Sequence, residues 1–194
     1  GFDSDTIDIF DAQFDFIQKA CIPVVKMHLL KAGPGTALFN RLSEEKRLIG
    51  NYNIYGENKG FDLELMTNII PKRMSRQEMF ENYSLLLKKI YDWENFFLRL
   101  EGFINNINYA PLLNKNSAKE IFLNDFLEKF ISSFDNELKS RVEYLIVLTL
   151  RRIPVMIYDI VTHILRHQIE VMKLPKLLED INKIIEYELE NGYY

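Results

Sequence analysis

Hydrophobic residues recur at helical spacing along most of the chain, and this pattern predicts a mainly α-helical protein. In the first expected helix the repeat is Ile7, Phe10, Phe14 and Ile17. Helices are expected over residues 6–20, 37–46, 76–91, 92–105, 118–133, 136–152, 154–172 and 175–190.

Local capping signals mark several of these helix ends. Thr36 is placed to cap the helix that starts at the next residue, and Ser75 with Glu78 forms the Ser-x-x-Glu pattern of a capping box. Asp135 or Asn136 is expected to cap the long helix that runs to about Arg152. Pro175 is expected to open the last helix, because proline is tolerated in a first turn.

The apolar run from Ile22 to Leu30 departs from the helical pattern and predicts one short β-strand. Helix, strand, loop and helix in this order belong to alternating β/α architecture, in which a strand needs neighbours. The chain offers this strand no partner, so we expect further sequence upstream of Gly1. An open strand edge favours pairing between copies, so self-association as a homo-oligomer through the N-terminal segment is also expected.

Composition and charge narrow the classes of protein. Hydrophobic residues make up 47% of the 194 residues and charged residues 27%, as in globular chains. The net charge is -4, whereas nucleic-acid binders need a basic face, so no nucleic acid is expected as a partner. No apolar run reaches the ~20 residues of a transmembrane helix. Cys21 is the single cysteine, which excludes an internal disulfide and fits a reducing, cytoplasmic compartment.

Two histidines form a candidate metal site. His163 and His167 are four residues apart on an expected helix, so they share a face, and Asp159 lies one turn earlier. This spacing can bind zinc, but a zinc site needs further ligands, and no glutamate follows His163 as in the metalloprotease pattern. The ordinary interpretation is a pair of polar residues on the solvent side of a helix, and a metal site is the alternative.

Two other groups have both a chemical and a structural interpretation. Asp3 and Asp5 are spaced as a carboxylate pair for acid–base chemistry, yet acidic residues just before a helix also serve as caps. The stretch Gly33-Pro34-Gly35-Thr36 is too short for a phosphate-binding loop and lacks its Gly-Lys-Ser/Thr ending. On residue chemistry alone, the first is a capping group and the second is a turn followed by a capped helix.

Several N-terminal motifs resemble a known family. The chain resembles the late part of a radical S-adenosylmethionine (SAM) barrel at Gly1-Phe2-Asp3-Ser4-Asp5, Asp8-Ile9-Phe10 and Gln13-x-x-Phe16-Ile17-Gln18. It resembles the last barrel strand and the loop after that strand from Ile22-Pro23-Val24 through Leu29-Leu30-Lys31-Ala32-Gly33-Pro34-Gly35-Thr36. It also resembles the C-terminal domain of unknown function in cobalamin-binding radical SAM proteins. This resemblance lies in Asp62-Leu63, Thr67 to Lys72 and the helix ending Ile90-Tyr91. Together these motifs cover about residues 1–105.

The resemblance implies a longer enzyme that carries its chemistry elsewhere. Such proteins hold a 4Fe-4S cluster on a Cys-x-x-x-Cys-x-x-Cys loop, cleave SAM reductively and often bind cobalamin in an upstream domain. This chain has one cysteine, so it is expected to bind none of these cofactors alone and to be inactive alone. Its expected partners are the radical SAM and cobalamin domains of the same polypeptide.

The resemblance also implies which residues would border SAM in the intact enzyme. They are Asp3, Asp5, Leu30, Pro34, Gly35 and Thr36. Ligands of barrel enzymes lie at the carboxyl ends of strands, which is where both stretches fall. Asp5 stands where many radical SAM proteins have a glutamate, and this is a departure from the family pattern.

We therefore expect three parts in the chain. Residues 1–50 would be the partial end of a radical SAM barrel, 51–60 a linker, and 61–194 a helical C-terminal domain of unknown function. That domain would cover the barrel and shape the substrate pocket of a cobalamin-dependent radical SAM enzyme, with methylation as one chemistry of the family. The alternatives are an independent helical interaction domain without catalysis, or a metal-binding domain using His163 and His167. The sequence does not indicate the substrate.

Overall fold

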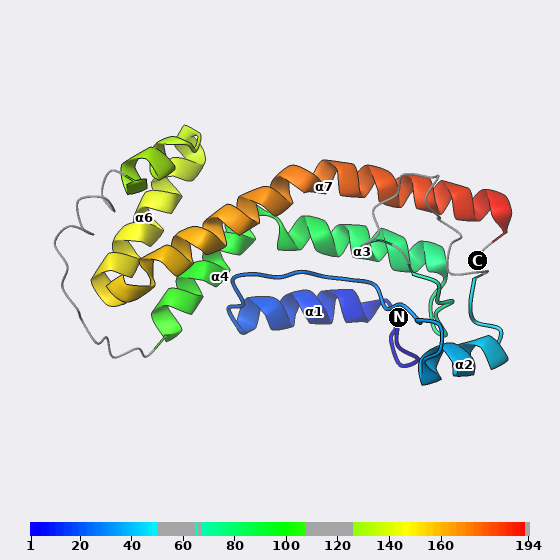
Figure 1. The fold of residues 1–194 in the computed structure, drawn as a ribbon. Helices are drawn as coiled ribbons and strands as arrows, with labels where there is room; N and C mark the ends of the chain where they lie inside the picture. Colours follow the sequence, from blue (N-terminus) through cyan, green and yellow to red (C-terminus); the bar gives the residue numbers. More distant parts are fainter. Residues whose placement is uncertain (50–64, 66, 108–125, 193–194) are drawn as a thin grey trace. The chain divides into compact units, whose positions relative to one another are not determined.

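The computed structural model describes residues 1–49, 65, 67–107 and 126–192, and it confirms a mainly α-helical protein (Figure 1). Residues 126–132 are also helical. None of the described helices is long and apolar enough to cross a membrane. The named helices are α1 Asp8–Lys19, α2 Ala37–Glu44, α3 Arg76–Ile90, α4 Trp93–Asn106, α6 Asn136–Arg152 and α7 Ile157–Asn191, with a 3₁₀ turn at Pro154–Met156.

The chain forms two compact units. Unit 1 consists of Gly1–Phe16, Val25–Asp92 and Ile169–Tyr194. Unit 2 consists of Ile17–Val24 and Trp93–Gln168. The predicted linker at 51–60 lies outside the described residues, so the predicted domain boundary remains a prediction.

The predicted helix starts are confirmed where they depend on local capping. The Thr36 hydroxyl accepts a hydrogen bond from the amide of Phe39 at the start of α2. Ser75 and Glu78 exchange the two hydrogen bonds of a capping box at the start of α3. Asp135 accepts hydrogen bonds from two amides at the start of α6. Each cap satisfies amide groups that the first helical turn leaves unbonded.

The strand predicted at residues 22–30 is wrong. In the described part of the chain no β-strand forms, and a single antiparallel bridge joins Leu48 to Ile69. Side chains bond the backbone of the extended segment instead. The Tyr83 hydroxyl donates to the carbonyl of Met27 at 2.8 Å, and the Tyr91 hydroxyl donates to that of Val25 at 3.5 Å. An apolar extended segment can thus be buried without a sheet when side chains satisfy its carbonyl groups.

The helix start predicted at Pro175 is also wrong, because α7 continues through this proline. A proline inside a helix removes one backbone hydrogen bond and usually costs about 3 kcal/mol. Burial of Ile181 and Ile184, both fully inaccessible, stabilises the part that follows. An ion pair from Lys176 to Asp180, at 2.6 Å, spans the next turn. Tertiary packing therefore outweighs the local helix-breaking tendency.

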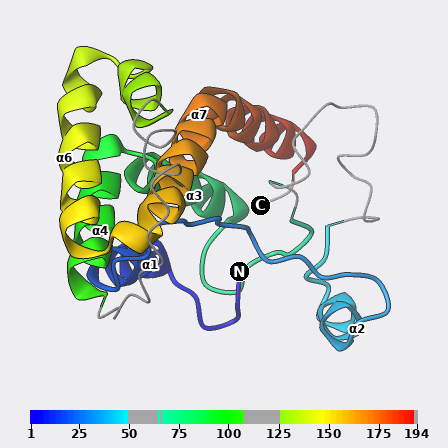
Figure 2. The same ribbon diagram turned by 60° about the vertical axis from the view of Figure 1, so that its left-hand side comes forward.

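The core of unit 2 lies among α4, α6 and the first half of α7. Figures 1 and 2 show α4 and α6 side by side. Trp93 lies at the start of α4, with its ring centroid 5.4 Å from that of Phe97 and 6.0 Å from that of Phe134. The other buried members of this core include Phe96, Leu100, Ile104, Val142, Leu145, Ile146, Ile157, Ile160 and Ile164.

In unit 1, α3 buries one face made of Met79, Phe80, Tyr83, Leu86, Leu87 and Ile90. A second, smaller apolar cluster of unit 1 consists of Ala32, Leu42 and Ile69. Tyr83 of the first group bonds the extended segment at Met27, and Ala32 of the second group lies at the end of that segment.

Candidate functional site

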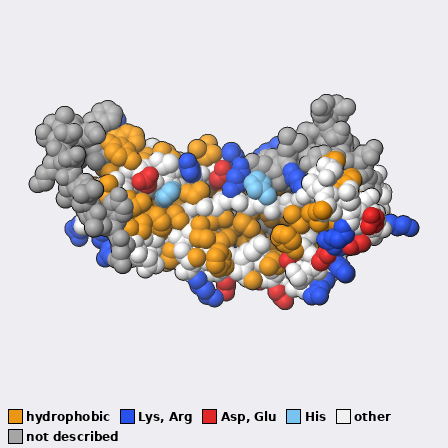
Figure 3. Space-filling view, turned by 60° about the horizontal axis from the view of Figure 1, so that its bottom comes forward, with side chains coloured by type: hydrophobic (Ala, Val, Ile, Leu, Met, Phe, Trp, Pro, Cys, Tyr) orange, Lys and Arg blue, Asp and Glu red, His pale blue; other side chains and the backbone are white. Residues whose placement is uncertain are grey.

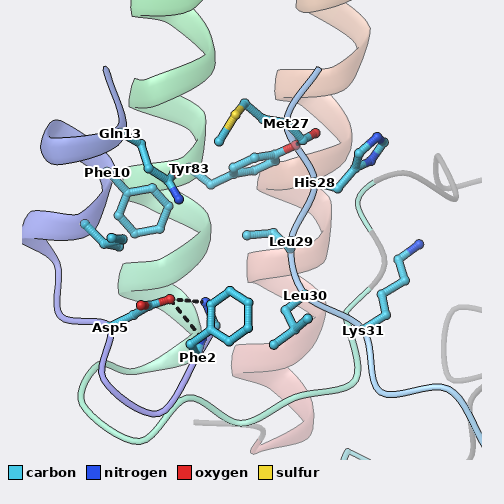
Figure 4. A pocket seen from close by; sticks show the side chains of 12 residues that line it. Phe2, Asp5, Phe10, Gln13, Met27, His28, Leu29, Leu30, Lys31 and Tyr83 are labelled. Atoms are coloured by element: carbon cyan, nitrogen blue, oxygen red, sulfur yellow. Dashed lines mark hydrogen bonds and ion pairs between the residues drawn. The ribbon is translucent and has the colours of Figure 1, made fainter. Parts of the chain in front are cut away.

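Unit 1 contains a cavity of about 480 Å³ between the N-terminal turn, α1, the extended segment and α3 (Figure 4). Cavities of this size accept small organic ligands. The lining residues are Gly1, Phe2, Asp5, Ile9, Phe10, Gln13, Met27, His28, Leu29, Leu30, Lys31 and Tyr83.

A tight turn at the N-terminus places Asp5 on the cavity wall. One carboxylate oxygen, Oδ2, accepts hydrogen bonds from the Gly1 amino group and the Phe2 amide, both at 2.8 Å. The Asp5 amide donates to the Phe2 carbonyl at 3.1 Å, which closes the turn. The Asp5 side chain is 10% exposed. Its other oxygen, Oδ1, accepts no hydrogen bond from the described residues and remains available to a ligand.

The rest of the wall is largely apolar, with one further polar group. In Figure 4 the Phe10 and Gln13 side chains point from α1 toward Tyr83, while His28 and Lys31 project from the other side of the extended segment. The Tyr83 hydroxyl donates to the Met27 carbonyl, so the proton of this hydroxyl is already used within the wall. The cavity therefore suits a ligand with a flat or apolar body and polar groups that reach Asp5 and Gln13.

Asp3 does not line the cavity and belongs instead to a network of ion pairs. Its two carboxylate oxygens accept hydrogen bonds from Arg41 at 2.6 Å and Arg47 at 2.7 Å. Both arginines also pair with Glu45, at 3.0 and 2.9 Å. The hydrogen bonds from Arg47 and then Arg41 lower the pKa of Asp3 to about 2. Asp3 thus remains ionised and fixes the N-terminal turn beside α2.

Pro34, Gly35 and Thr36 form the turn and helix cap that residue chemistry predicted. The Thr36 hydroxyl donates to the Gly33 carbonyl at 2.7 Å and accepts from the Phe39 amide at 3.1 Å. None of the three lines the cavity. Of the residues expected to border SAM, the cavity therefore brings together Asp5 and Leu30. Their binding of SAM remains a prediction.

Gly35 is a sharp test of this turn. Its φ is +80°, and a Cβ added there would meet no atom within 4 Å, so the effect of a side chain is confined to the backbone. We expect Gly35→Ala to lower the free energy of unfolding by about 1 kcal/mol, because a left-handed conformation disfavours a Cβ. Urea unfolding measures this change. Gly35→Asn is the control and should lose less; equal stability of Gly35→Ala and the wild type would contradict the prediction.

His163 and His167 pack against aromatic rings in unit 2, and the predicted place of His167 on the solvent side of a helix is wrong, because its side chain is buried. The His167 ring stacks on Phe96 at a centroid distance of 3.9 Å and meets the edge of Trp93 at 4.6 Å. His163 lies against Phe103 at 5.8 Å. Burial lowers the pKa of both, and that of His167 falls to about 3. Across the described residues no group of three His, Cys, Asp or Glu side chains is placed to hold a metal.

Sequence reasoning missed several residues of the cavity wall. Tyr83 lies 56 residues from the carbonyl that it contacts, and no local pattern predicts such a pairing. The sequence did carry a signal for Gln13. It lies three residues after Phe10, so it shares the inward face of the first helix, where the structure leaves it only partly exposed. A polar residue on the inward face of an amphipathic helix indicates either a buried partner or a site.

Comparison with known proteins identifies a family for most of the chain. Residues 36–168, more than two thirds of the sequence, match the family model described as Domain of unknown function (DUF4070). Of the residues that line the cavity, this range includes Tyr83 alone. The searches of curated proteins and of solved structures gave no match. The chain therefore belongs to the family described as Domain of unknown function (DUF4070).

Proposed function

We propose that this chain is the C-terminal accessory part of a cobalamin-dependent radical SAM enzyme, in which it covers the barrel and shapes the substrate pocket. The observation that carries the proposal is the composition of the cavity wall. Residues 1–31, whose motifs resemble the end of a radical SAM barrel, form most of it, and Tyr83 of the matched family range closes one side. Because the N-terminal segment and the matched domain both line the cavity, a ligand bound there would contact both of them.

The extended segment also supports the proposal. Residues 22–32 are neither helical nor part of a sheet among the described residues, yet tyrosine hydroxyls bond the carbonyls of Val25 and Met27 along the segment. The segment thus presents side chains such as those of Leu29 and Leu30 to the cavity without a strand beside it among the described residues.

The residues present fit only part of the cofactor set. Asp5 and Gln13 offer a hydrogen-bond acceptor and an amide beside the apolar wall, as a nucleoside requires. A cluster loop of the radical SAM type needs three cysteines, and the chain has Cys21 alone. On this proposal the upstream domains supply the cluster ligands and the cobalamin. The chain's own residues orient the bound SAM and exclude water from it.

The test compares the intact gene product with the 194-residue chain. After anaerobic reconstitution with iron and sulfide, the intact protein should bind about four iron atoms and cleave SAM reductively. The chain alone should do neither. A folded intact protein that holds no cluster after this reconstitution would contradict the proposal.

A helical interaction domain without catalysis is the second candidate function. Several large apolar side chains of unit 2 are exposed, among them Leu98 at 57% and Tyr158 at 51%. Figure 3 shows hydrophobic side chains at many points of one molecular face. Exposed apolar surface favours association with a partner. This candidate predicts an intact gene product with no cluster loop, which the same experiment examines.

A further inference from the structure

The cavity wall at Leu30 is fixed from behind by two buried polar side chains. The Thr67 hydroxyl donates to the Leu30 carbonyl at 2.6 Å. The Asn68 side chain bonds Ala32 twice: its Oδ1 accepts from the Ala32 amide at 2.9 Å, and its Nδ2 donates to the Ala32 carbonyl at 2.8 Å. Thr67 is 2% exposed and Asn68 is 9% exposed. These contacts do for the segment what a neighbouring strand would otherwise do.

The backbone that carries Thr67 and Asn68 is fixed in turn by Arg76, the first residue of α3. Its guanidinium donates to the Thr67 carbonyl at 2.9 Å and also to the carbonyl of Ile69. Arg76 is completely buried. Its charge is balanced by Glu188 near the end of α7, through hydrogen bonds of 2.9 and 2.6 Å. A continuous route of hydrogen bonds therefore joins the last helix to the cavity wall.

We propose that Thr67 and Asn68 are positioning residues for the ligand of this cavity, and that the Arg76–Glu188 pair couples α7 to them. The identity of that ligand as SAM rests on the proposed function, whereas the positioning role does not. Leu30 presents its side chain to the cavity, so its backbone must be fixed before a ligand binds. A wall that is ordered in advance avoids the loss of entropy that ordering on binding would impose.

Among the described residues the segment has no strand partner, so these hydrogen bonds decide whether it stays in place. Here the described residues give the Leu30 carbonyl one hydrogen bond, from Thr67. Its loss should let the segment open locally without unfolding the helices, since local opening is governed by the bonds and packing of the segment itself.

The first test measures amide hydrogen exchange in the 194-residue chain by NMR. Thr67→Val removes the hydroxyl and keeps the shape, and Thr67→Ser keeps the hydroxyl. We expect Thr67→Val to speed exchange of the Ala32 amide roughly tenfold, the effect of losing one buried hydrogen bond. Thr67→Ser should change it less than about twofold. Unaltered exchange in Thr67→Val, or equal acceleration in both variants, overturns the positioning role.

The coupling to α7 is tested in the same way. Glu188→Gln removes the charge beside Arg76, and Glu186→Gln is the matched control on the exposed side of the same helix. We expect Glu188→Gln to speed Ala32 exchange at least about threefold, with exchange in α4 of unit 2 unchanged. Equal exchange at Ala32 in the two variants would show that the last helix does not control the wall.

The second test uses the intact enzyme and SAM, so that the two proposals fail separately. Thr67→Val should raise the Kd of SAM roughly tenfold and leave kcat at saturating SAM within about twofold, and Thr67→Ser should restore the Kd. If wild-type enzyme binds SAM and Thr67→Val binds it equally well, the positioning role in ligand binding is wrong. If wild-type enzyme binds no SAM, the proposed function is wrong, and the exchange experiment alone decides the positioning role.

Discussion

Replacing Arg76 by methionine is expected to lower the free energy of unfolding by about 3–5 kcal/mol, the usual effect of removing one partner of a buried ion pair. The Glu188 side chain is 4% exposed and would lose its counter-ion. The carbonyls of Thr67 and Ile69 would lose their guanidinium donor as well. Urea unfolding of the 194-residue chain, followed by circular dichroism, measures the change.

The pH dependence of the variant gives an independent check. Burial raises the pKa of the Glu188 carboxyl and lowers that of the Arg76 guanidinium, so each charge persists in the core because the other is beside it. Without Arg76, protonation is the remaining way for Glu188 to stay buried. A carboxyl whose pKa is raised by folding destabilises the folded chain as the pH rises above its unfolded pKa. The stability that Arg76→Met loses relative to wild type should therefore be greater at pH 7 than near pH 4.5.

A double variant separates loss of charge pairing from loss of packing. Arg76→Met with Glu188→Leu replaces both charged groups by apolar ones and should recover part of the stability that Arg76→Met loses. Arg76→Lys should lose less than Arg76→Met, because it keeps one positive charge beside Glu188. It should still be less stable than wild type, because lysine cannot bond two oxygens in one plane. An Arg76→Met chain within about 1 kcal/mol of wild type would refute the importance of this pair.

The helix ends could be predicted because their causes lie within one turn of sequence. Thr36 bonds an amide three residues later, and so does Ser75. The cavity and the buried ion pair depend instead on contacts between distant residues. Arg76 and Glu188 are 112 residues apart, and each taken alone resembles an ordinary charged residue on an exposed helix face. No local pattern distinguishes such a pair from a solvated one.

The two errors in secondary structure have the same origin. The run from Ile22 to Leu30 has strand composition, yet whether it forms a sheet depends on another strand, and none is formed in the described part of the chain. Pro175 has a helix-breaking side chain, yet the helix continues because Ile181 and Ile184, which follow it within unit 1, are fully buried. In both cases local propensity describes the segment correctly, and its tertiary surroundings decide the outcome.

Acid should destabilise unit 2 through His167. Burial, followed by the charge of Arg99, lowers the pKa of His167 to about 3, from an ordinary value of 6.5. The unfolded chain therefore binds a proton below pH 6.5 that the folded chain rejects until about pH 3. Stability is full above pH 6.5 and declines as the pH falls, by roughly 1.4 kcal/mol per pH unit from this group. The expected loss between pH 6.5 and pH 4 is about 3 kcal/mol.

His167→Phe is the variant that isolates this contribution. Phenylalanine keeps a flat ring against Phe96 and Trp93, but it cannot bind a proton. Unfolding curves in urea at pH 7, 5.5 and 4 should show a smaller decline for His167→Phe than for wild type. His163→Phe is the matched control: His163 is less buried than His167, and its pKa is lowered in the same direction. If His167→Phe and wild type lost stability in parallel, His167 would be protonated inside the folded core, and its packing between the two rings would have to differ from the structure.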